Sequence, residues 1–198
     1  GGYQNMVLDV DLTNRRVRTR QLDERTERLF IGGKGLGAKI LYDELKPRLD
    51  PLGPKNLLVF STGPLTGTAA PSSGRWAVVT KSPLTGLFLD SQVGGFVGAQ
   101  IKLAGYDAIV IRGAADSPVF LKVEDDQAEI ASAEDLWGKG CLETEKTLKA
   151  RLGNEFKVGS IGPAGERLVR YACITFDLFR QAGRGGAGAV MGSKRLKA

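Results

Sequence analysis

The sequence predicts an α+β domain whose sheets are antiparallel or mixed. Short apolar and β-branched runs, bounded by glycine, proline or asparagine, outnumber the stretches with helical periodicity. The helical stretches fall between these runs without the regular alternation that builds parallel βαβ units. With 198 residues, 42% of them hydrophobic, the chain can bury a full core and is expected to form one domain over 1–198.

The amino-terminal part predicts a hairpin followed by two helices. Residues 6–12 and 17–22 alternate apolar and polar side chains around a Thr-Asn-Arg turn, as paired strands do. Asp23 is a suitable N-cap for a short helix that ends at the Gly32-Gly33 pair. A second helix is expected over residues 36–46, because Pro47 cannot continue it.

Four short apolar runs in the middle of the chain predict buried strands, at residues 57–60, 76–80, 87–89 and 108–111. The connection 61–75 is rich in glycine, threonine and proline and is too long for a hairpin loop, which is typical of functional loops. After the third run we expect a turn at 90–95 and a helix at 96–104.

The last part predicts a second hairpin, an amphipathic helix, two strands, a loop and a final helix. The amphipathic helix begins at Asp135 or Thr144 and ends at Gly153. The other elements are residues 119–123 and 128–131 for the hairpin, 157–161 and 168–175 for the strands, 176–186 for the loop, and 187 onward for the small-residue helix.

The composition narrows the function classes. Cys141 and Cys173 are in no metal-ligand spacing, so we expect two small core residues and neither a disulfide framework nor a zinc or iron–sulfur site. The chain has no histidine, which excludes Ser–His and Cys–His catalysis. No run approaches the roughly 18 apolar residues of a membrane span, and none has the form of a signal peptide. We therefore expect a cytoplasmic protein without a membrane partner.

The net charge of +6 favours an anionic ligand. Basic residues are spread among acidic ones and are not interleaved with several aromatic residues, so nucleic acid is not an expected partner. The chain starts Gly1-Gly2 and ends at Ala198 without a polar tail, and we expect it to be a fragment of a longer enzyme.

The 27 glycines gather in clusters, which suggests turns that lie close to a ligand. The cluster at 32–37 opens a helix and is either a tight turn between helices or an anion site. The cluster at 183–188 lies beside Arg180 and Arg184, and its G-x-G-x-x-G spacing lacks the rest of a Rossmann unit. A third segment combines Arg75 with the turn at Gly94-Gly95.

The second and third segments share one plan, in which a strand leads through a glycine turn with a nearby arginine into a helix of small residues. A ligand with two similar anionic arms would suit such a pair. At Arg75 the alternative is a surface salt bridge, and at the turns the alternative is a purely structural glycine.

Five colinear segments then show a resemblance that covers nearly the whole chain. They are residues 31–37 (IGGKGLG), 61–68 (STGPLTGT), 79–86 (VTKSPLTG), 104–109 (AGYDAI) and 188–194 (GAVMGSK). Together they resemble the amino-terminal domain of aldehyde:ferredoxin oxidoreductases. The resemblance implies an α+β fold in which two β-sheets form a saddle with flanking helices. A tungsten or molybdenum ion chelated by two pterins sits on that saddle, and magnesium bridges the pterin phosphates.

The resemblance also implies which residues hold the cofactor, and it implies no catalytic residue in this chain. One pterin arm falls to Arg75, Gln92, Gly94 and Gly95, and the other to Arg180, Gln181, Gly183 and Arg184. The backbone carbonyls of Gln92 and Gln181 would bind magnesium, which prefers hard oxygen ligands. The family pattern has asparagine and alanine at these two positions, and a contact through the backbone carbonyl tolerates a change of side chain.

By this resemblance the parent enzyme oxidises an aldehyde to a carboxylic acid and passes two electrons through a [4Fe-4S] cluster to ferredoxin, with a homodimer as one possible assembly. The cluster ligands and catalytic residues belong to later domains, so the isolated domain is expected to be inactive. The alternatives are a stand-alone anion- or nucleotide-binding module without redox activity, and a structural domain whose glycines only shape turns.

Overall fold

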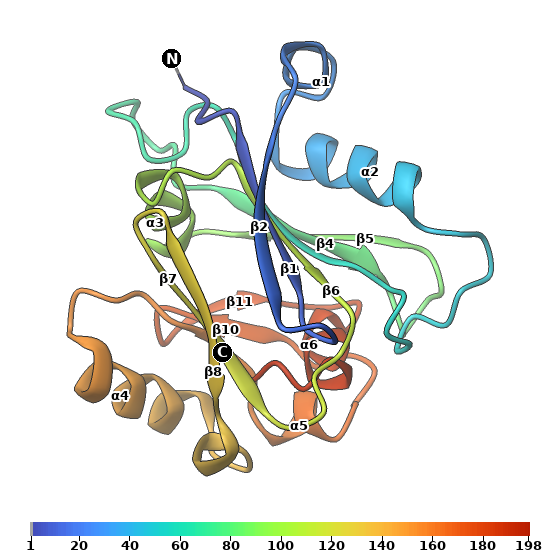
Figure 1. Cartoon of the computed structure of the whole chain (residues 1–198), viewed down its shortest axis with the longest axis vertical. Helices are drawn as coiled ribbons and strands as arrows, with labels where there is room; N and C mark the ends of the chain where they lie inside the picture. The colour runs from blue at the N-terminus through green and yellow to red at the C-terminus, as the bar shows by residue number, and fades with distance from the viewer. Residues whose placement is uncertain (1) are drawn as a thin grey trace.

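A computed structural model describes residues 2–198 and confirms the α+β class. Its largest layer is a six-stranded mixed sheet in the order β2-β1-β6-β3-β4-β5 (Figure 1). Only β1 and β6 pair in parallel, and the other neighbours are antiparallel. The strands are β1 (Met6–Asp11), β2 (Arg16–Gln21), β3 (Leu58–Thr62), β4 (Trp76–Lys81), β5 (Phe88–Val93) and β6 (Ala108–Arg112).

Two smaller antiparallel sheets complete the strands. A three-stranded sheet in the order β11-β10-β9 consists of β9 (Gly159–Ser160), β10 (Ile174–Phe176) and β11 (Arg180–Ala182). The hairpin of β7 (Val119–Glu124) and β8 (Gln127–Ser132) forms a separate ribbon, as its turn at Asp125 predicted. The two sheets of the prediction are therefore present, and the ribbon is an addition to them.

Helices cover both faces of the large sheet (Figure 1). On one face, α2 (Gly33–Glu44) packs against β3 and β4, and α1 (Glu24–Phe30) precedes it with Asp23 as the predicted N-cap. On the other face lie α3 (Val97–Leu103) and α6 (Ala187–Ser193). The remaining helices are a 3-10 turn (Glu134–Leu136), α4 (Cys141–Leu152) and α5 (Pro163–Glu166).

The two-residue period of the central strands explains this sandwich. Val59 and Val79 face α2, whereas their neighbours Phe60 and Val78 face the α3 and α6 side. Because both faces are buried, β3, β4 and β6 each contain a continuous apolar run, which made them readable from the sequence. Phe60, Trp76 and Phe176 then join the large sheet to the three-stranded sheet through tilted and edge-to-face contacts.

Several predicted boundaries are wrong. The turn expected at 90–95 is strand as far as Val93, and α2 starts at Gly33, earlier than expected. Helix α4 starts at Cys141, between the two expected positions. The strand expected at 168–175 is mostly turn after α5 and survives only as β10, because Leu168 takes a positive φ of 58°. The loop expected at 176–186 contains β11.

Two expectations on composition can also be compared with the structure. Cys141 and Cys173 are free thiols, and they are half-buried where we expected full burial. Among the helices of residues 2–198, none is long and apolar enough to cross a membrane.

Candidate functional site

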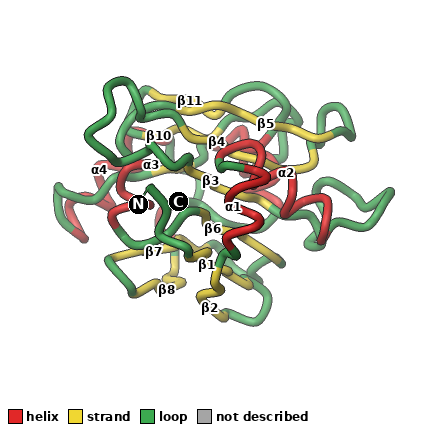
Figure 2. Tube along the Cα trace, turned by 90° about the horizontal axis from the view of Figure 1, so that it is seen from above, coloured by secondary structure: helices red, strands yellow, loops and turns green. Residues whose placement is uncertain are grey.

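The structure brings the two glycine turns together. Strand β5 leads through Gly94-Gly95 into α3, and β11 leads through Gly183 into α6, as the shared plan predicted. The hydroxyl of Ser91 on β5 donates a hydrogen bond of 3.0 Å to the carbonyl of Gly183. Figure 2 shows β11 and β5 along the same edge of the molecule. Had the turns lain on opposite sides, a ligand with two arms could not have joined them.

The first turn is assembled from three distant segments. Gly95 has a φ of 87° and its Cα lies against Asp177 and Arg180, so a side chain there would be both strained and crowded. Gly74, which precedes Arg75, lies on the other side of this turn, and a Cβ on Gly74 would lie 3.6 Å from the Gly95 carbonyl oxygen. The backbone just before Arg75 and the side chain of Arg180 on β11 therefore both lie beside this turn.

The second turn is held by packing at its far end. Gly185 and Gly186 have φ values of 61° and 87°, and a Cβ on either would overlap Leu89 or the Arg170 carbonyl. The Ser82 hydroxyl donates to the Gly185 carbonyl at 2.6 Å. At these two positions glycine is required by the structure itself, which was the alternative considered for the turns.

Gly94 and Gly183 differ from these, because neither conformation nor packing requires glycine at either position. Their φ values are not positive, and a Cβ on either would meet nothing within 4 Å. Among the glycines that the structure describes, only the α4 N-cap Gly140 shares this combination. Bare backbone facing open space is what a ligand needs in order to approach the main chain closely.

The three arginines of the prediction surround these turns. Arg75, Arg180 and Arg184 are exposed, and within residues 2–198 none of them forms an ion pair. The surface salt bridge considered for Arg75 is therefore not formed in this part of the chain. Guanidinium groups without a carboxylate partner are the side-chain groups best suited to bind phosphate.

The two glutamines have their side chains tied down. Gln92 donates to Asp90 along β5 at 3.2 Å. The Gln181 side-chain oxygen accepts hydrogen bonds from Thr175 at 3.0 Å and from the Cys173 thiol at 2.8 Å. Burial raises the pKa of Cys173, so the thiol keeps the proton that it donates. The strands thus accommodate glutamine at both positions without closing the turns.

Two residues of this region escaped the sequence analysis. Ser91 bridges the two turns, and Asp177 caps α3 from the loop between β10 and β11. The sequence shows that each of them lies near a glycine turn. Only the fold shows which turn each of them contacts.

The glycine cluster at 32–37 has mainly the structural role. Gly32 and Gly33 have φ values of 154° and 51°, and a Cβ on Gly32 would lie 2.6 Å from the Thr62 carbonyl oxygen. The cluster therefore forms the tight turn between α1 and α2 that positive φ requires. Its Lys34 reaches Asp90 on β5 at 3.7 Å.

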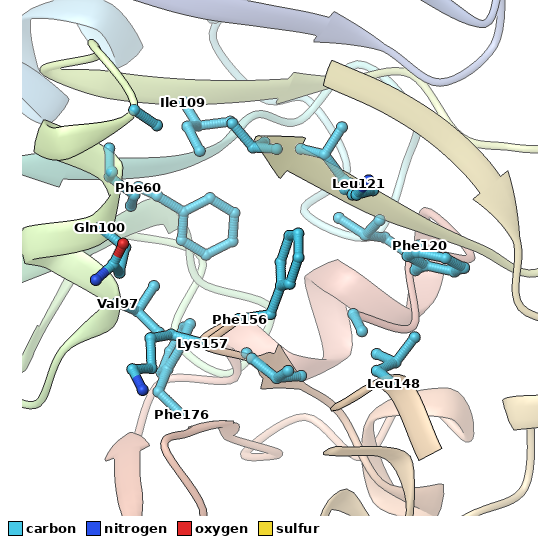
Figure 3. A pocket seen from close by; sticks show the side chains of 18 of the residues that line it. Phe60, Val97, Gln100, Ile109, Phe120, Leu121, Leu148, Phe156, Lys157 and Phe176 are labelled. Atoms are coloured by element: carbon cyan, nitrogen blue, oxygen red, sulfur yellow. The ribbon is translucent and has the colours of Figure 1, made fainter. Parts of the chain in front are cut away.

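A separate cavity of about 160 Å³ lies inside the molecule, between α3, α4, the β7–β8 ribbon and the sheets. Figure 3 shows Phe60, Phe156 and Leu121 around it. None of the eight predicted cofactor-binding residues lines this cavity. Its walls are mostly apolar and its volume is below the range of about 300–1,000 Å³ that is usual for small-molecule sites. A cofactor with phosphate arms fits the two turns better.

No group of histidine, cysteine or carboxylate side chains in residues 2–198 could hold a metal ion. Backbone oxygens and the groups of a cofactor are the other ligands that a metal can take. The carbonyls of Gln92 and Gln181, on the two strands that lead into the turns, are the oxygens that the resemblance assigns to this role.

Comparisons with known proteins show what this chain is similar to. A family profile described as "Aldehyde ferredoxin oxidoreductase, N-terminal domain" matches residues 7–198. The tungsten-containing aldehyde ferredoxin oxidoreductases of Pyrococcus furiosus and Pyrococcus abyssi are 49% and 48% identical over the whole chain, which spans 33% of each relative's length.

Two further relatives carry other names. The WOR-like subunit of an aliphatic sulfonate oxidoreductase from Pyrococcus furiosus is 42% identical. The match includes 99% of this chain and 34% of that subunit's length. Among solved structures, the active-site complex BamBC of benzoyl coenzyme A reductase, in complex with 1,5-dienoyl-CoA, superimposes with a TM-score of 0.96. It is 42% identical, over 99% of this chain and 30% of that one.

Proposed function

The chain belongs to the aldehyde ferredoxin oxidoreductase family, and from that premise we propose that residues 1–198 form a domain that holds a tungsten bis-pterin cofactor by its two phosphate arms. The observation that carries the proposal concerns Gly94 and Gly183. Neither backbone conformation nor packing requires glycine at these positions, and a hydrogen bond from Ser91 to the Gly183 carbonyl joins their two turns. Arg75 would serve the first arm and Arg184 the second, and Arg180, which enters the second turn and packs beside Gly95 of the first, would lie between the two arms.

The proposal extends to magnesium. Magnesium is usually held by few protein ligands together with phosphate oxygens and water, so two backbone carbonyls suffice for the protein's share. The carbonyls of Gln92 and Gln181 would provide this share, since each lies on the strand that enters one turn. The cofactor phosphates would complete the coordination.

In the whole enzyme the bound metallopterin would supply two-electron redox chemistry that no side chain of this domain offers. The role of the domain is to bind and orient it, with the arginines neutralising the phosphates and the bare turns admitting them to the main chain. We propose the oxidation of an aldehyde to a carboxylic acid as the reaction of the enzyme, with electrons passing through a [4Fe-4S] cluster to ferredoxin. The 46–49% identity to relatives named for tungsten and aldehyde supports this choice.

The cofactor proposal is tested by the composition of the purified protein. Protein from cells supplied with tungstate should contain tungsten, magnesium and pterin phosphate, measured by elemental analysis. The double variant Arg75→Ala/Arg180→Ala should lose them, because each hydrogen bond to a charged group contributes about 1.5–3 kcal/mol, or about 10-fold or more in affinity. Arg18→Ala is the matched control, since Arg18 is an exposed arginine on β2 at the opposite edge of the large sheet. Unchanged tungsten in the double variant would refute the role of the two arginines.

A stand-alone anion- or nucleotide-binding module is the competing function, and the same exposed arginines would serve it. Calorimetry separates the two. Tight binding of a simple mononucleotide, with no binding of a phosphorylated pterin, would favour that module over the metallopterin domain.

A further inference from the structure

The loop between β10 and β11 reaches across to the first turn. One carboxylate oxygen of Asp177 accepts hydrogen bonds from the backbone amides of Phe96 at 2.6 Å and Val97 at 3.4 Å. These are amides at the start of α3, which its own sequence leaves without a side-chain cap. The same oxygen lies where a Cβ on Gly95 would be. The loop between β10 and β11 thus caps α3, the helix that follows β5 of the large sheet.

The loop that carries Asp177 is fixed from several directions. Asp177 and Leu178 have positive φ values of 47° and 63°, which is unfavourable for leucine in particular. The Leu178 amide donates to the buried Glu145 at 2.9 Å, and Glu145 pairs with Lys149 at 2.6 Å. The Asp177 amide donates to the Val158 carbonyl at 3.2 Å. A strained conformation persists only where its surroundings determine it, as they do here.

We propose that Asp177 is a positioning residue that locks the two phosphate-binding turns into one site, an inference that rests on the proposed function. Its carboxylate fixes Gly95 and the start of α3. Arg180 follows three residues later, at the start of β11, and its side chain packs against Gly95. The distance between Gly94 and Gly183 is then set by this loop together with the Ser91 bond.

The capped helix also directs where the first phosphate lies. An internal carboxylate already uses the Phe96 and Val97 amides, and a phosphate placed there would meet a like charge. The first phosphate would therefore be held upstream of α3, by the bare backbone of Gly94 and the Arg75 side chain. Glycine at 95 leaves room for the carboxylate that enforces this placement.

The test compares Asp177→Ala and Asp177→Asn with Asp23→Ala in protein produced with and without tungstate. Asp23 is the matched control, because it caps α1 in the same manner, with 2.9 Å to the Thr26 amide, and lies away from both turns. Asparagine keeps an oxygen that can accept the Phe96 amide. The readouts are tungsten retained per chain after gel filtration and the rise in thermal midpoint that the cofactor produces.

We expect Asp177→Ala to retain about 10-fold less tungsten, as is usual when a residue supporting the ligand contacts is removed. Asp177→Asn should recover most of the loss, and Asp23→Ala should keep the wild-type content although its cofactor-free midpoint falls. The inference is overturned if Asp177→Ala retains as much tungsten as Asp23→Ala, or if asparagine restores nothing. Absence of tungsten from the unsubstituted protein would instead overturn the proposed function.

Discussion

At the scale of single residues, glycine serves three purposes in this chain. At Gly33 the backbone takes a positive φ, and at Gly37 a side chain would overlap Val79 on the neighbouring strand. At Gly94 and Gly183 neither reason applies, and ligand access is the explanation that we propose. The sequence marked all of them alike as glycine clusters, because a sequence alone does not show φ angles or neighbours.

This distinction predicts that stability and binding move in opposite directions. Gly94→Ala and Gly183→Ala should each raise the free energy of unfolding of the cofactor-free protein by about 0.4–1 kcal/mol, because alanine fits and restricts the unfolded chain. Both should nevertheless lower tungsten content, since a methyl group fills the approach to the backbone. Gly95→Ala, the comparison variant, should destabilise by about 1–3 kcal/mol because of its φ of 87°. Urea unfolding and elemental analysis measure the two effects, and a Gly94→Ala protein with full tungsten would contradict the explanation.

At the scale of elements, the sequence predicted those whose signal is local. The hairpin of β1 and β2 and the buried strands β3, β4 and β6 follow from alternation and apolar runs. The end of β5 and all of β11 were missed, because Gln92 and Gln181 are exposed polar residues on strands whose pairing decides their state.

The site was predicted in the same uneven way. Its arginines and glycine turns could be named from the sequence, because residue type and spacing mark them. The strand predicted at 168–175 is mostly a turn that follows α5, and Gly165 of α5 packs directly on α6 at Gly188. That contact, like the reach of Asp177 across 81 residues to Phe96, depends on the tertiary fold.

The end of α6 is tied to the large sheet by Lys194. Its buried ammonium group donates to the carbonyls of Asn56 at 2.5 Å and Gly113 at 2.9 Å, next to the ends of β3 and β6. Burial, assisted by the charge of Arg112, lowers its pKa to about 8 from 10.5. The folded protein therefore binds this proton less tightly than the unfolded chain does.

The sign of the resulting pH dependence follows from linkage. Below pH 8 both states are protonated and the full cost of burying the charge is present, whereas above pH 10.5 both are neutral and the cost is gone. Between these values the Lys194 contribution to the free energy of unfolding should rise with pH, by about 3 kcal/mol in total. Lys194→Met should lack this rise. Urea unfolding of both proteins from pH 7 to 11 measures it, because the other groups that titrate in this range, such as tyrosines, are the same in the two proteins. Parallel curves for the two proteins would show that the ammonium pKa is not lowered.

At the scale of the whole molecule, the domain is shared by relatives with different names. Relatives named for aldehydes, for sulfonates and for benzoyl coenzyme A are 42–49% identical to it, and the last superimposes with a TM-score of 0.96. The features on which the proposed site depends concern the phosphate arms of a cofactor and contain no acid or base placed for a substrate. A domain of this kind can serve several reactions, with the substrate selected elsewhere in the enzyme.

This reasoning predicts the behaviour of a chimera. When these 198 residues replace the matching third of the Pyrococcus furiosus tungsten-containing aldehyde ferredoxin oxidoreductase, which is 49% identical, the chimera should load tungsten and keep aldehyde oxidation. We expect its rate to stay within about 10-fold of the parent, a barrier change of about 1.4 kcal/mol, because the exchanged part holds the cofactor and leaves the substrate contacts in place. The same chimera with Arg75→Ala and Arg180→Ala should lose tungsten and activity together. A chimera that is full of tungsten but inactive toward aldehydes would mean that this domain itself selects the reaction.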